Sequence, residues 1–206
     1  MEFKDMKLEF KTDRIVMKDY PDQVVMMDWE DKIMKKSAEY ICQSKGDVLE
    51  IGFGMGYSAT QIQKHNPKSH TIIEMDPIVI TRLKEWSKDY DNIIIVEGTW
   101  QEKLNELGTF DEIFFDDYPL KEPENDFEKR LVGERFYMFL DICLYSHTNP
   151  NSKFSAYIHD PERKFGDRLL QNKMVTYEEY FVDIDVPDNC NYYRDTKGLI
   201  PIITKI

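Results

Sequence analysis

The sequence predicts an α/β fold, a single doubly wound domain with a mostly parallel sheet and helices on both faces. Short apolar strands alternate with helical segments along most of the 206 residues. One of these strands runs directly into three alternating glycines, and a helical segment follows them. Parallel strands need crossover helices, and in such sheets ligands bind beyond the carboxyl ends of the strands. The strand ends are therefore the candidate sites.

The pattern of apolar residues predicts the elements in order. Apolar and β-branched runs predict strands at residues 48–51, 71–74, 92–96, 110–115, 154–158, 175–184 and 199–204. Helical spacing predicts helices at residues 58–65, 78–90 and 127–144. Residues 92–96 are so rich in isoleucine and valine that we expect this strand to be buried on both faces. The last two strands have no helix between them and are expected to form a hairpin-like pair.

The length of the chain suffices for one α/β domain with a substantial core. No linker, repeat or low-complexity tract divides it. Because the first residues alternate charge and bulk, we expect an N-terminal arm over residues 1–24 and the folded domain over residues 25–206. Nothing in the first residues resembles a signal peptide, and no apolar stretch approaches the length of a membrane span.

Composition narrows the classes of partner. The net charge of −12 repels phosphate backbones and no basic stripe offsets it, so a cationic substrate is favoured over nucleic acid. Cys42, Cys143 and Cys190 are far apart and odd in number, which predicts a reducing, cytoplasmic location. The four histidines are scattered, so no metal site is expected. No membrane partner is expected, and the oligomeric state is left open.

The glycine turn is the most informative segment. Gly52, Gly54 and Gly56 lack a Cβ, so a ligand can lie against bare backbone before a helix start that carries partial positive charge. The dinucleotide fingerprint G-x-G-x-x-G places its third glycine one residue later, where this chain has Tyr57. A nicotinamide cofactor is therefore disfavoured. A different nucleoside-like ligand and a glycine turn without any ligand remain as alternatives.

Two later strand ends also carry candidate binding residues. Glu74 follows Gly52 by 22 positions, a distance at which a carboxylate can accept the hydroxyls of a ribose. Alternatively, Glu74 caps the helix that begins at Asp76. Trp100 follows the next strand, where its ring borders an adenine or simply packs in the core.

Carboxylates at two further positions point to a cation. Asp116 and Asp117 follow an apolar strand, and two adjacent carboxylates are costly to bury without a cation. They are expected to point in different directions, unless they simply occupy a solvated loop. Upstream, helical spacing places Glu30 on one face between Met26 and Met34. A bound cation would balance that carboxylate, although the methionines alone are also typical of core packing.

These residues together resemble a known family. The motif E-x-G-x-G-x-G, from Glu50 to Gly56, resembles the first motif of S-adenosylmethionine (SAM)-dependent methyltransferases. With the other segments, the chain resembles guanidinoacetate methyltransferase and the fungal-type arginine δ-N-methyltransferase. Those segments are Val25-Met26-x-x-Trp29-Glu30-x-x-x-Met34, Ile72-Ile73-Glu74, Asp116-x-Tyr118-Pro119-Leu120, Asp188-Asn189-Cys190-x-Tyr192-Tyr193 and Ile203-Thr204-Lys205.

The resemblance implies a seven-stranded, Rossmann-like methyltransferase sheet with an antiparallel last strand, SAM as cofactor, and a role for each matched residue. Glu30 and Asp116 would grip a guanidino group, with Asp116 as the base and Glu30 as the clamp, or the reverse. The residues implied in cofactor binding are Met26, Met34, Gly52, Phe53, Gly54, Met55, Gly56, Tyr57, Glu74, Met75, Asp76, Thr99, Trp100 and Asp116.

The resemblance leaves the methyl acceptor open. The matched family has a Leu-Lys-Pro-Gly-Gly-like turn before the fifth strand, where this chain has residues 148–153, and residues 159–163 lack its Thr-Ser pair. We expect N-methylation of a small guanidino compound similar to guanidinoacetate. The alternatives are a protein-arginine methyltransferase of the δ-N type and a SAM-binding regulatory protein without catalysis.

Overall fold

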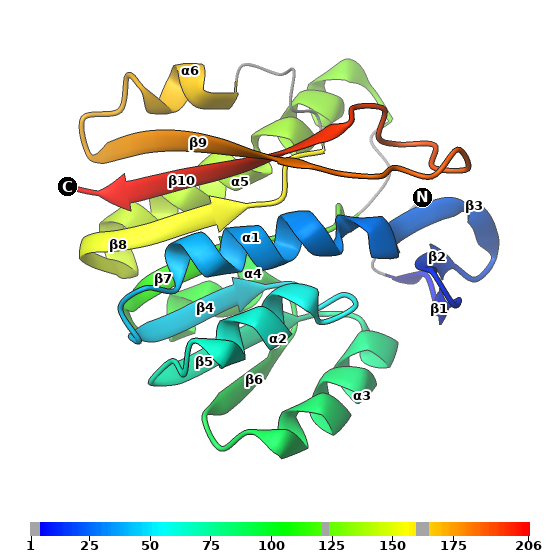
Figure 1. The fold of residues 1–206 in the computed structure, drawn as a ribbon, viewed down its shortest axis with the longest axis horizontal. Helices are drawn as coiled ribbons and strands as arrows, with labels where there is room; N and C mark the ends of the chain where they lie inside the picture. Colours follow the sequence, from blue (N-terminus) through cyan, green and yellow to red (C-terminus); the bar gives the residue numbers. More distant parts are fainter. Residues whose placement is uncertain (1–4, 121–123, 160–164) are drawn as a thin grey trace.

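The computed structural model describes residues 5–120, 124–159 and 165–206 of the protein. Within them, the central sheet has seven strands in the order β6-β5-β4-β7-β8-β10-β9 (Figure 1). Strand β10 is antiparallel to both of its neighbours, whereas β6, β5, β4, β7 and β8 are parallel. The strands are β4 (Asp47–Ile51), β5 (Ser69–Glu74), β6 (Ile93–Glu97), β7 (Phe110–Phe115), β8 (Thr148–Ala156), β9 (Val175–Asp183) and β10 (Lys197–Lys205). The predicted doubly wound sheet with an antiparallel last strand is confirmed.

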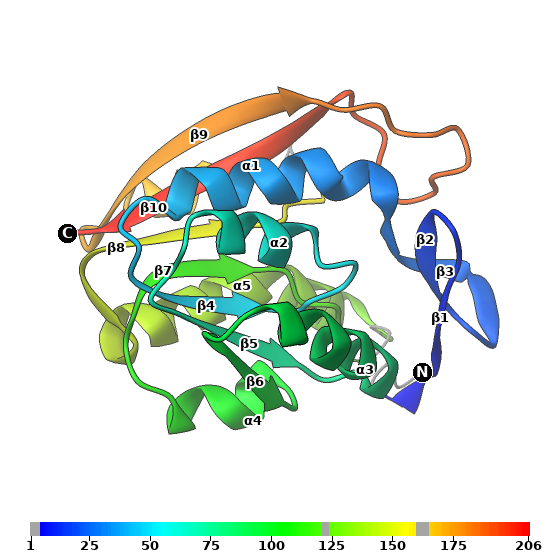
Figure 2. The same cartoon turned by 60° about the horizontal axis from the view of Figure 1, so that its bottom comes forward.

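Helices cover both faces of this sheet (Figures 1 and 2). One face carries α1 (Asp31–Ile41), α2 (Tyr57–Lys64) and α3 (Pro77–Trp86). The other carries α4 (Trp100–Lys103), α5 (Asp126–Ser146) and α6 (Phe165–Leu169). Three short 3₁₀ helices complete the described helices: η2 (Asp28–Glu30), η3 (Ser87–Asp89) and η4 (Leu104–Glu106). None of the helices formed by the described residues combines the length and the apolar character needed to cross a bilayer.

The two helical layers bury separate apolar clusters against the sheet. On one face, Phe115 of β7 packs against Phe139 of α5, with ring centroids 4.6 Å apart. On the other, α1 buries Met34, Ala38 and Ile41, whose spacing of three to four residues places them on one side of the helix. Helix α1 was not among the helices predicted from the sequence, although its buried residues follow the helical period.

Two predictions from the sequence are wrong. Strand β6 lies at the edge of the sheet and pairs only with β5, so Ile94 is 50% exposed instead of buried. Met26 does not share a helical face with Glu30 and Met34, because Met26 lies in β3, Glu30 in η2 and Met34 in α1. Strand pairing in the N-terminal segment overrides the helical spacing of these three residues.

A second, smaller sheet lies beyond the carboxyl ends of the parallel strands (Figures 1 and 2). It consists of β1 (Leu8–Phe10), β2 (Arg14–Met17) and β3 (Tyr20–Met27), all antiparallel. Ile15 and Met17 of β2 are almost completely buried. The division into an arm and a domain after residue 24 stays a prediction, and β3 runs across that position.

Candidate active site

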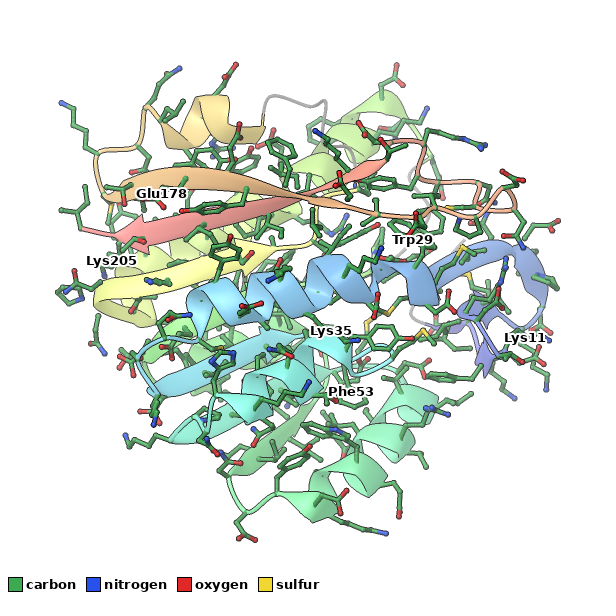
Figure 3. The ribbon with its side chains drawn as sticks, viewed as in Figure 1. Lys11, Trp29, Lys35, Phe53, Glu178 and Lys205 are labelled. Carbon is green, nitrogen blue, oxygen red and sulfur yellow. The ribbon has the colours of Figure 1, made fainter. Side chains whose placement is uncertain are left out.

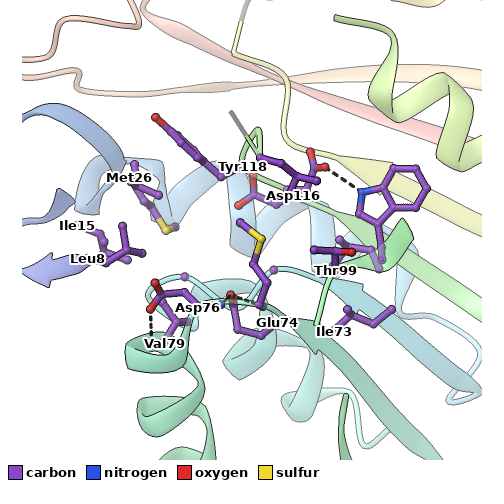
Figure 4. A pocket seen from close by; sticks show the side chains of 18 of the residues that line it. Leu8, Ile15, Met26, Ile73, Glu74, Asp76, Val79, Thr99, Asp116 and Tyr118 are labelled. Carbon is purple, nitrogen blue, oxygen red and sulfur yellow. Dashed lines mark hydrogen bonds between the residues drawn. The ribbon is translucent and has the colours of Figure 1, made fainter. Parts of the chain in front are cut away.

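A pocket lies where the carboxyl ends of β4, β5 and β7 meet, beneath the small N-terminal sheet (Figure 4). Backbone hydrogen bonds continue past the strand ends and hold them together. Gly52 N donates to Ile73 O at 2.9 Å, and Asp116 N donates to Ile51 O at 3.0 Å. The parallel register therefore brings the glycine turn, the end of β5 and Asp116 to one place, as expected for a sheet of this type.

Most of the predicted cofactor residues line this pocket: Met26, Gly52, Gly54, Glu74, Met75, Asp76, Thr99, Trp100 and Asp116. The other predicted cofactor residues lie outside its wall. Met34 and Phe53 are buried in the core, while Met55 and Tyr57 are partly buried against it. Gly56 is the N-cap of α2.

Two glycines of the turn are required by their neighbours as well as by their backbone. Gly52 has a φ of +82°, and a Cβ there would stand 2.2 Å from the carbonyl oxygen of Asp116. Gly54 has a φ of +52°, and its Cβ would stand 2.7 Å from the sulfur of Met26. A Cβ is therefore excluded at Gly52 by backbone, whereas at Gly54 it would be strained by the positive φ and would displace the flexible side chain of Met26. The turn is packed directly against two other parts of the pocket wall.

The carboxylate of Glu74 ties the glycine turn to the start of α3. One oxygen accepts the backbone N–H of Phe53 at 2.8 Å, and the other accepts those of Met75 and Asp76 at 2.8 and 2.9 Å. A carboxylate has about four acceptor sites, so about one remains for a ligand. Asp76 in turn caps α3 through a single oxygen, Oδ1, which accepts two backbone N–H groups. The cap of α3 is therefore Asp76 and not Glu74, which is buried and binds the backbone ahead of the helix.

The motif residue Glu50 points into the interior. Its side chain is fully buried, accepts a hydrogen bond from Ser58 Oγ, and lies 2.9 Å from Nε2 of the buried His70. Nδ1 of His70 lies 3.1 Å from the amide nitrogen of Gln63. Glu50 therefore fixes α2 and β5 to the strand that carries the glycine turn.

The neighbours Asp116 and Asp117 have different surroundings. Asp117 accepts hydrogen bonds from Trp100 Nε1 at 2.9 Å and Arg135 Nε at 2.8 Å, so a cation of α5 balances it. No donor within the described residues bonds the carboxylate of Asp116. Burial, followed by the charges of Glu30 and Asp117, raises the pKa of Asp116 well above its ordinary value. Asp116 is therefore the carboxylate that faces the pocket without a protein cation.

Glu30 lies next to the pocket, and its charge acts on Asp116. Its side chain is buried, and its Oε1 accepts hydrogen bonds from Met27 N at 2.8 Å and from the hydroxyl of Tyr192. Burial raises the pKa of Glu30 to about 7, although these hydrogen bonds act in the opposite direction. The charge of Glu30 and burial also raise the pKa of Tyr157.

Sequence reasoning missed one wall of the pocket. Leu8, Ile15, Met17 and Val25 line it from the small N-terminal sheet. The segment Arg14-Ile15-Val16-Met17 has the β-branched, apolar character of a strand, and that signal was present in the sequence. Tyr157 was also missed, because nothing local distinguishes it from a core tyrosine.

The arrangement fits SAM. Gly52 and Gly54 line the pocket, apolar side chains of β2 and α3 can cover a nucleoside, and the carboxylates of Glu74 and Asp76 can accept hydroxyls. The space beside the α-carbons of Gly52 and Gly54 is filled by Asp116 and Met26, so the missing side chains serve close packing of the turn. Within the described residues, no cluster of histidine, cysteine and acidic side chains could hold a metal ion.

The family model for guanidinoacetate N-methyltransferase matches residues 4–131 of the chain. The chain belongs to the guanidinoacetate N-methyltransferase family. This membership and the fold identify a SAM-dependent N-methyltransferase domain, and the predicted cofactor is confirmed.

Two fungal relatives of the chain share the name protein arginine N-methyltransferase 2. The chain is 34% identical to protein arginine N-methyltransferase 2 of Candida glabrata over 95% of its own length and 46% of that protein. It is 40% identical to the protein of the same name in Saccharomyces cerevisiae, over 91% of its own length and 50% of that protein. The chain thus spans about half the length of these relatives. In fold it matches the N-methyltransferase NodS of Bradyrhizobium japonicum, with a TM-score of 0.60, 16% identity and coverage of 86% and 96% of the two chains.

One region that departs from the family motif forms regular structure. Residues 148–153 are part of β8, where the side chain of Ser152 donates to Phe110 O at 2.7 Å and Asn151 has a φ of +70°. The loop at residues 159–163, which also departs from the motif, falls almost entirely outside the described residues.

Proposed function

We propose that this methyltransferase domain transfers a methyl group from SAM to the guanidino group of an arginine side chain in a protein. The observation that carries the proposal is a pair of carboxylates at the cofactor pocket, Glu30, which is buried, and Asp116, which is partly buried and lines the pocket. Each has a raised pKa, and the charge of Glu30 acts on Asp116. A cation placed between them would relieve both the burial cost and the mutual repulsion.

The chemistry of a guanidinium matches this pair. It carries up to five N–H donors in a planar fork and has no free nitrogen lone pair while it is protonated. When bound, SAM supplies an electrophilic methyl group. Glu30 would hold the planar fork by charge-assisted hydrogen bonds. Asp116 would accept the proton that leaves the reacting nitrogen, a role favoured by its raised pKa, although the two residues could exchange roles.

The relatives support a protein acceptor over the small guanidino compound expected from the sequence. Both fungal proteins compared above are named protein arginine N-methyltransferase 2. The resemblance to arginine δ-N-methyltransferases makes the δ nitrogen the expected position. A small acceptor such as guanidinoacetate is the second candidate, because the family model that matches the chain bears that name.

The two acceptors can be separated by one assay. The purified chain is incubated with methyl-labelled SAM and either guanidinoacetate, free arginine or arginine-containing proteins, and the products are identified by mass. Label in protein arginine supports the proposal, whereas label in guanidinoacetate alone replaces it with the second candidate. Tight SAM binding without transfer to any guanidino compound would contradict both.

Two isosteric variants test the assigned residues. We expect Glu30→Gln and Asp116→Asn each to lower methyl transfer at least a hundredfold, within the usual effect of a positioned acid–base group, and to leave SAM affinity nearly unchanged. Glu39→Gln is the matched control for Glu30, because the side chain of Glu39 on α1 is 47% exposed and forms an ion pair with Lys36 at the surface. Wild-type turnover in either site variant would refute the assignment.

A further inference from the structure

The segment between β9 and β10 brings a tyrosine onto Glu30. The hydroxyl of Tyr192 donates to Glu30 Oε1, and the backbone N–H of Met27 donates to the same oxygen at 2.8 Å. Both hydrogen bonds end on Oε1, and neither occupies Oε2. The hydroxyl of Tyr157 also acts on this carboxylate and lowers the pKa of Glu30. Tyr192 is 162 positions away from Glu30 in the sequence, so only the folded chain creates this contact.

Neighbouring contacts hold Tyr192 in place. Trp29, which is labelled in Figure 3, precedes Glu30 in the sequence. Its ring centroid lies 6.1 Å from that of Tyr192 and 4.9 Å from that of Tyr193. Asn191 donates a hydrogen bond to the backbone oxygen of Asp22 in β3 at 3.0 Å. The segment is thereby attached to the small N-terminal sheet just before Tyr192.

The other side of the segment is attached to β10. Tyr193 is almost completely buried, and its hydroxyl donates to the backbone oxygen of Lys197 at 2.7 Å. Adjacent tyrosines therefore have different hydrogen-bond partners. One hydroxyl donates to a carboxylate of the candidate active site, and the other donates to a backbone oxygen of β10. The second tyrosine is a natural control for the first.

We propose that Tyr192 is a positioning residue that holds Glu30 by one oxygen and presents the other oxygen to the guanidino acceptor. This inference rests on the proposed function. A carboxylate held at Oε1 by two donors loses the freedom to rotate, so its remaining oxygen has a defined direction when the acceptor arrives.

The hydrogen bond also affects the charge of Glu30. The groups that interact with it are Tyr192, Tyr157 at the end of β8, Asp116 after β7 and Tyr57 of α2. Burial raises the pKa of Glu30, while the hydroxyl of Tyr192 lowers it. Arg14 of β2 is a cation that interacts with Tyr192, and it is itself paired with Asp13.

Removing the hydroxyl of Tyr192 should shift the pKa of Glu30 in a definite direction. In Tyr192→Phe the carboxylate loses a donor to its charged form, so the pKa of Glu30 rises and the ionised form appears only at higher pH. A hydrogen bond to a charged group corresponds to a shift of about one unit. The acidic limb of kcat/KM should therefore move up by about one pH unit, with roughly a tenfold loss at pH 6 to 7. Part of that loss should be recovered at alkaline pH, and SAM affinity should stay unchanged.

The experiment compares wild type, Tyr192→Phe and Tyr193→Phe by pH–rate profile and by ¹³C NMR titration of the carboxyl of Glu30, assigned with Glu30→Gln. The expected result is a raised Glu30 pKa and a displaced acidic limb only in Tyr192→Phe. An unchanged pKa in Tyr192→Phe, or an equal shift in Tyr193→Phe, would overturn the inference. If wild type methylates no guanidino compound, the proposed function fails, while the NMR titration still decides whether Tyr192 controls Glu30.

A second variant keeps the inference testable if Tyr192→Phe does not fold. 3-Fluorotyrosine at position 192 keeps the ring and makes its hydroxyl a stronger donor. We therefore expect shifts opposite in direction to those of Tyr192→Phe. The acidic limb and the Glu30 pKa should both move down. A shift upward, or none, would contradict the proposed hydrogen bond.

Discussion

The burial that suits Glu30 and Asp116 to bind a cation also lowers the stability of the folded protein when these carboxylates are ionised. Burial raises the pKa of Glu30 from an ordinary 4.5 to about 7. Below about pH 4.5 the carboxyl is protonated in both the folded and the unfolded chain and contributes nothing to the pH dependence. Between these values the unfolded chain ionises while the folded chain keeps its proton. Stability contributed by this group therefore falls as the pH rises, and the full loss is present above about pH 7.

Glu30→Gln should therefore stabilise the free protein at high pH. The amide keeps an oxygen for Met27 and Tyr192 but never ionises, so a penalty of up to about 3 kcal/mol disappears. We expect the difference in free energy of unfolding between variant and wild type to be larger at pH 8 than at pH 4.5. Urea denaturation at both pH values measures it.

Glu39→Gln provides the baseline for this comparison, because the side chain of Glu39 reaches solvent and its ionisation in the folded chain carries no burial penalty. If Glu30→Gln gives the same difference at both pH values, Glu30 is not held in a protonated form by burial. Increased stability together with lost turnover would mark Glu30 as a residue kept for function at the expense of stability.

At the scale of elements, the small N-terminal sheet closes the pocket. Leu8, Ile15 and Met17 line the wall, so the position of β1 and β2 decides the shape of the cofactor site. Phe10 attaches this sheet to α3, because the guanidinium of Arg82 lies 4.1 Å from the centre of its ring. This contact between Phe10 and Arg82 lies outside the wall of the pocket.

We therefore expect Phe10→Ala to weaken SAM binding without contact between residue 10 and the cofactor. Loss of the ring removes a cation–π contact and apolar packing worth about 1–2 kcal/mol, which corresponds to roughly a tenfold higher Kd. Isothermal titration calorimetry measures the Kd. Lys11→Ala is the control, since Lys11 is exposed and pairs only with Glu9. An unchanged Kd in Phe10→Ala would mean that the sheet holds its position without this contact.

At the scale of the whole molecule, the net charge of −12 matters for association with a cation. An acidic molecule attracts a positively charged acceptor over distances comparable with the Debye length, which is about 10 Å at 0.1 M salt and about 3 Å at 1 M. The effect acts on the encounter with the acceptor, whereas the buried carboxylates act after binding.

We predict that kcat/KM for a cationic arginine acceptor falls severalfold when ionic strength rises from about 0.05 to 0.5 M, because screening weakens the long-range attraction. The value of kcat should change little. Steady-state kinetics at several salt concentrations provide the measurement, with potassium chloride and sodium chloride compared to exclude specific ion effects. A kcat/KM that is independent of salt would show that the overall charge serves solubility alone.

The alternating strands and helices, the glycine turn and the candidate carboxylates could all be predicted without a structure. These features are local: side-chain periodicity predicts an element, and glycine is favoured where the backbone turns with a positive φ. The family resemblance added the number of strands and the antiparallel β10, both of which the structure confirms.

Only the tertiary structure decided which of these residues face the pocket. It placed β6 at an edge, gave Asp117 a cation from α5, formed one pocket wall from β1 and β2, and brought Tyr192 to Glu30. Burial, pairing and pKa depend on groups far apart in sequence, and their free energies arise only when folding removes water from between them. For that reason, the residue types in the sequence indicated which chemistry to expect. The contacts that control this chemistry could be identified only from the folded structure.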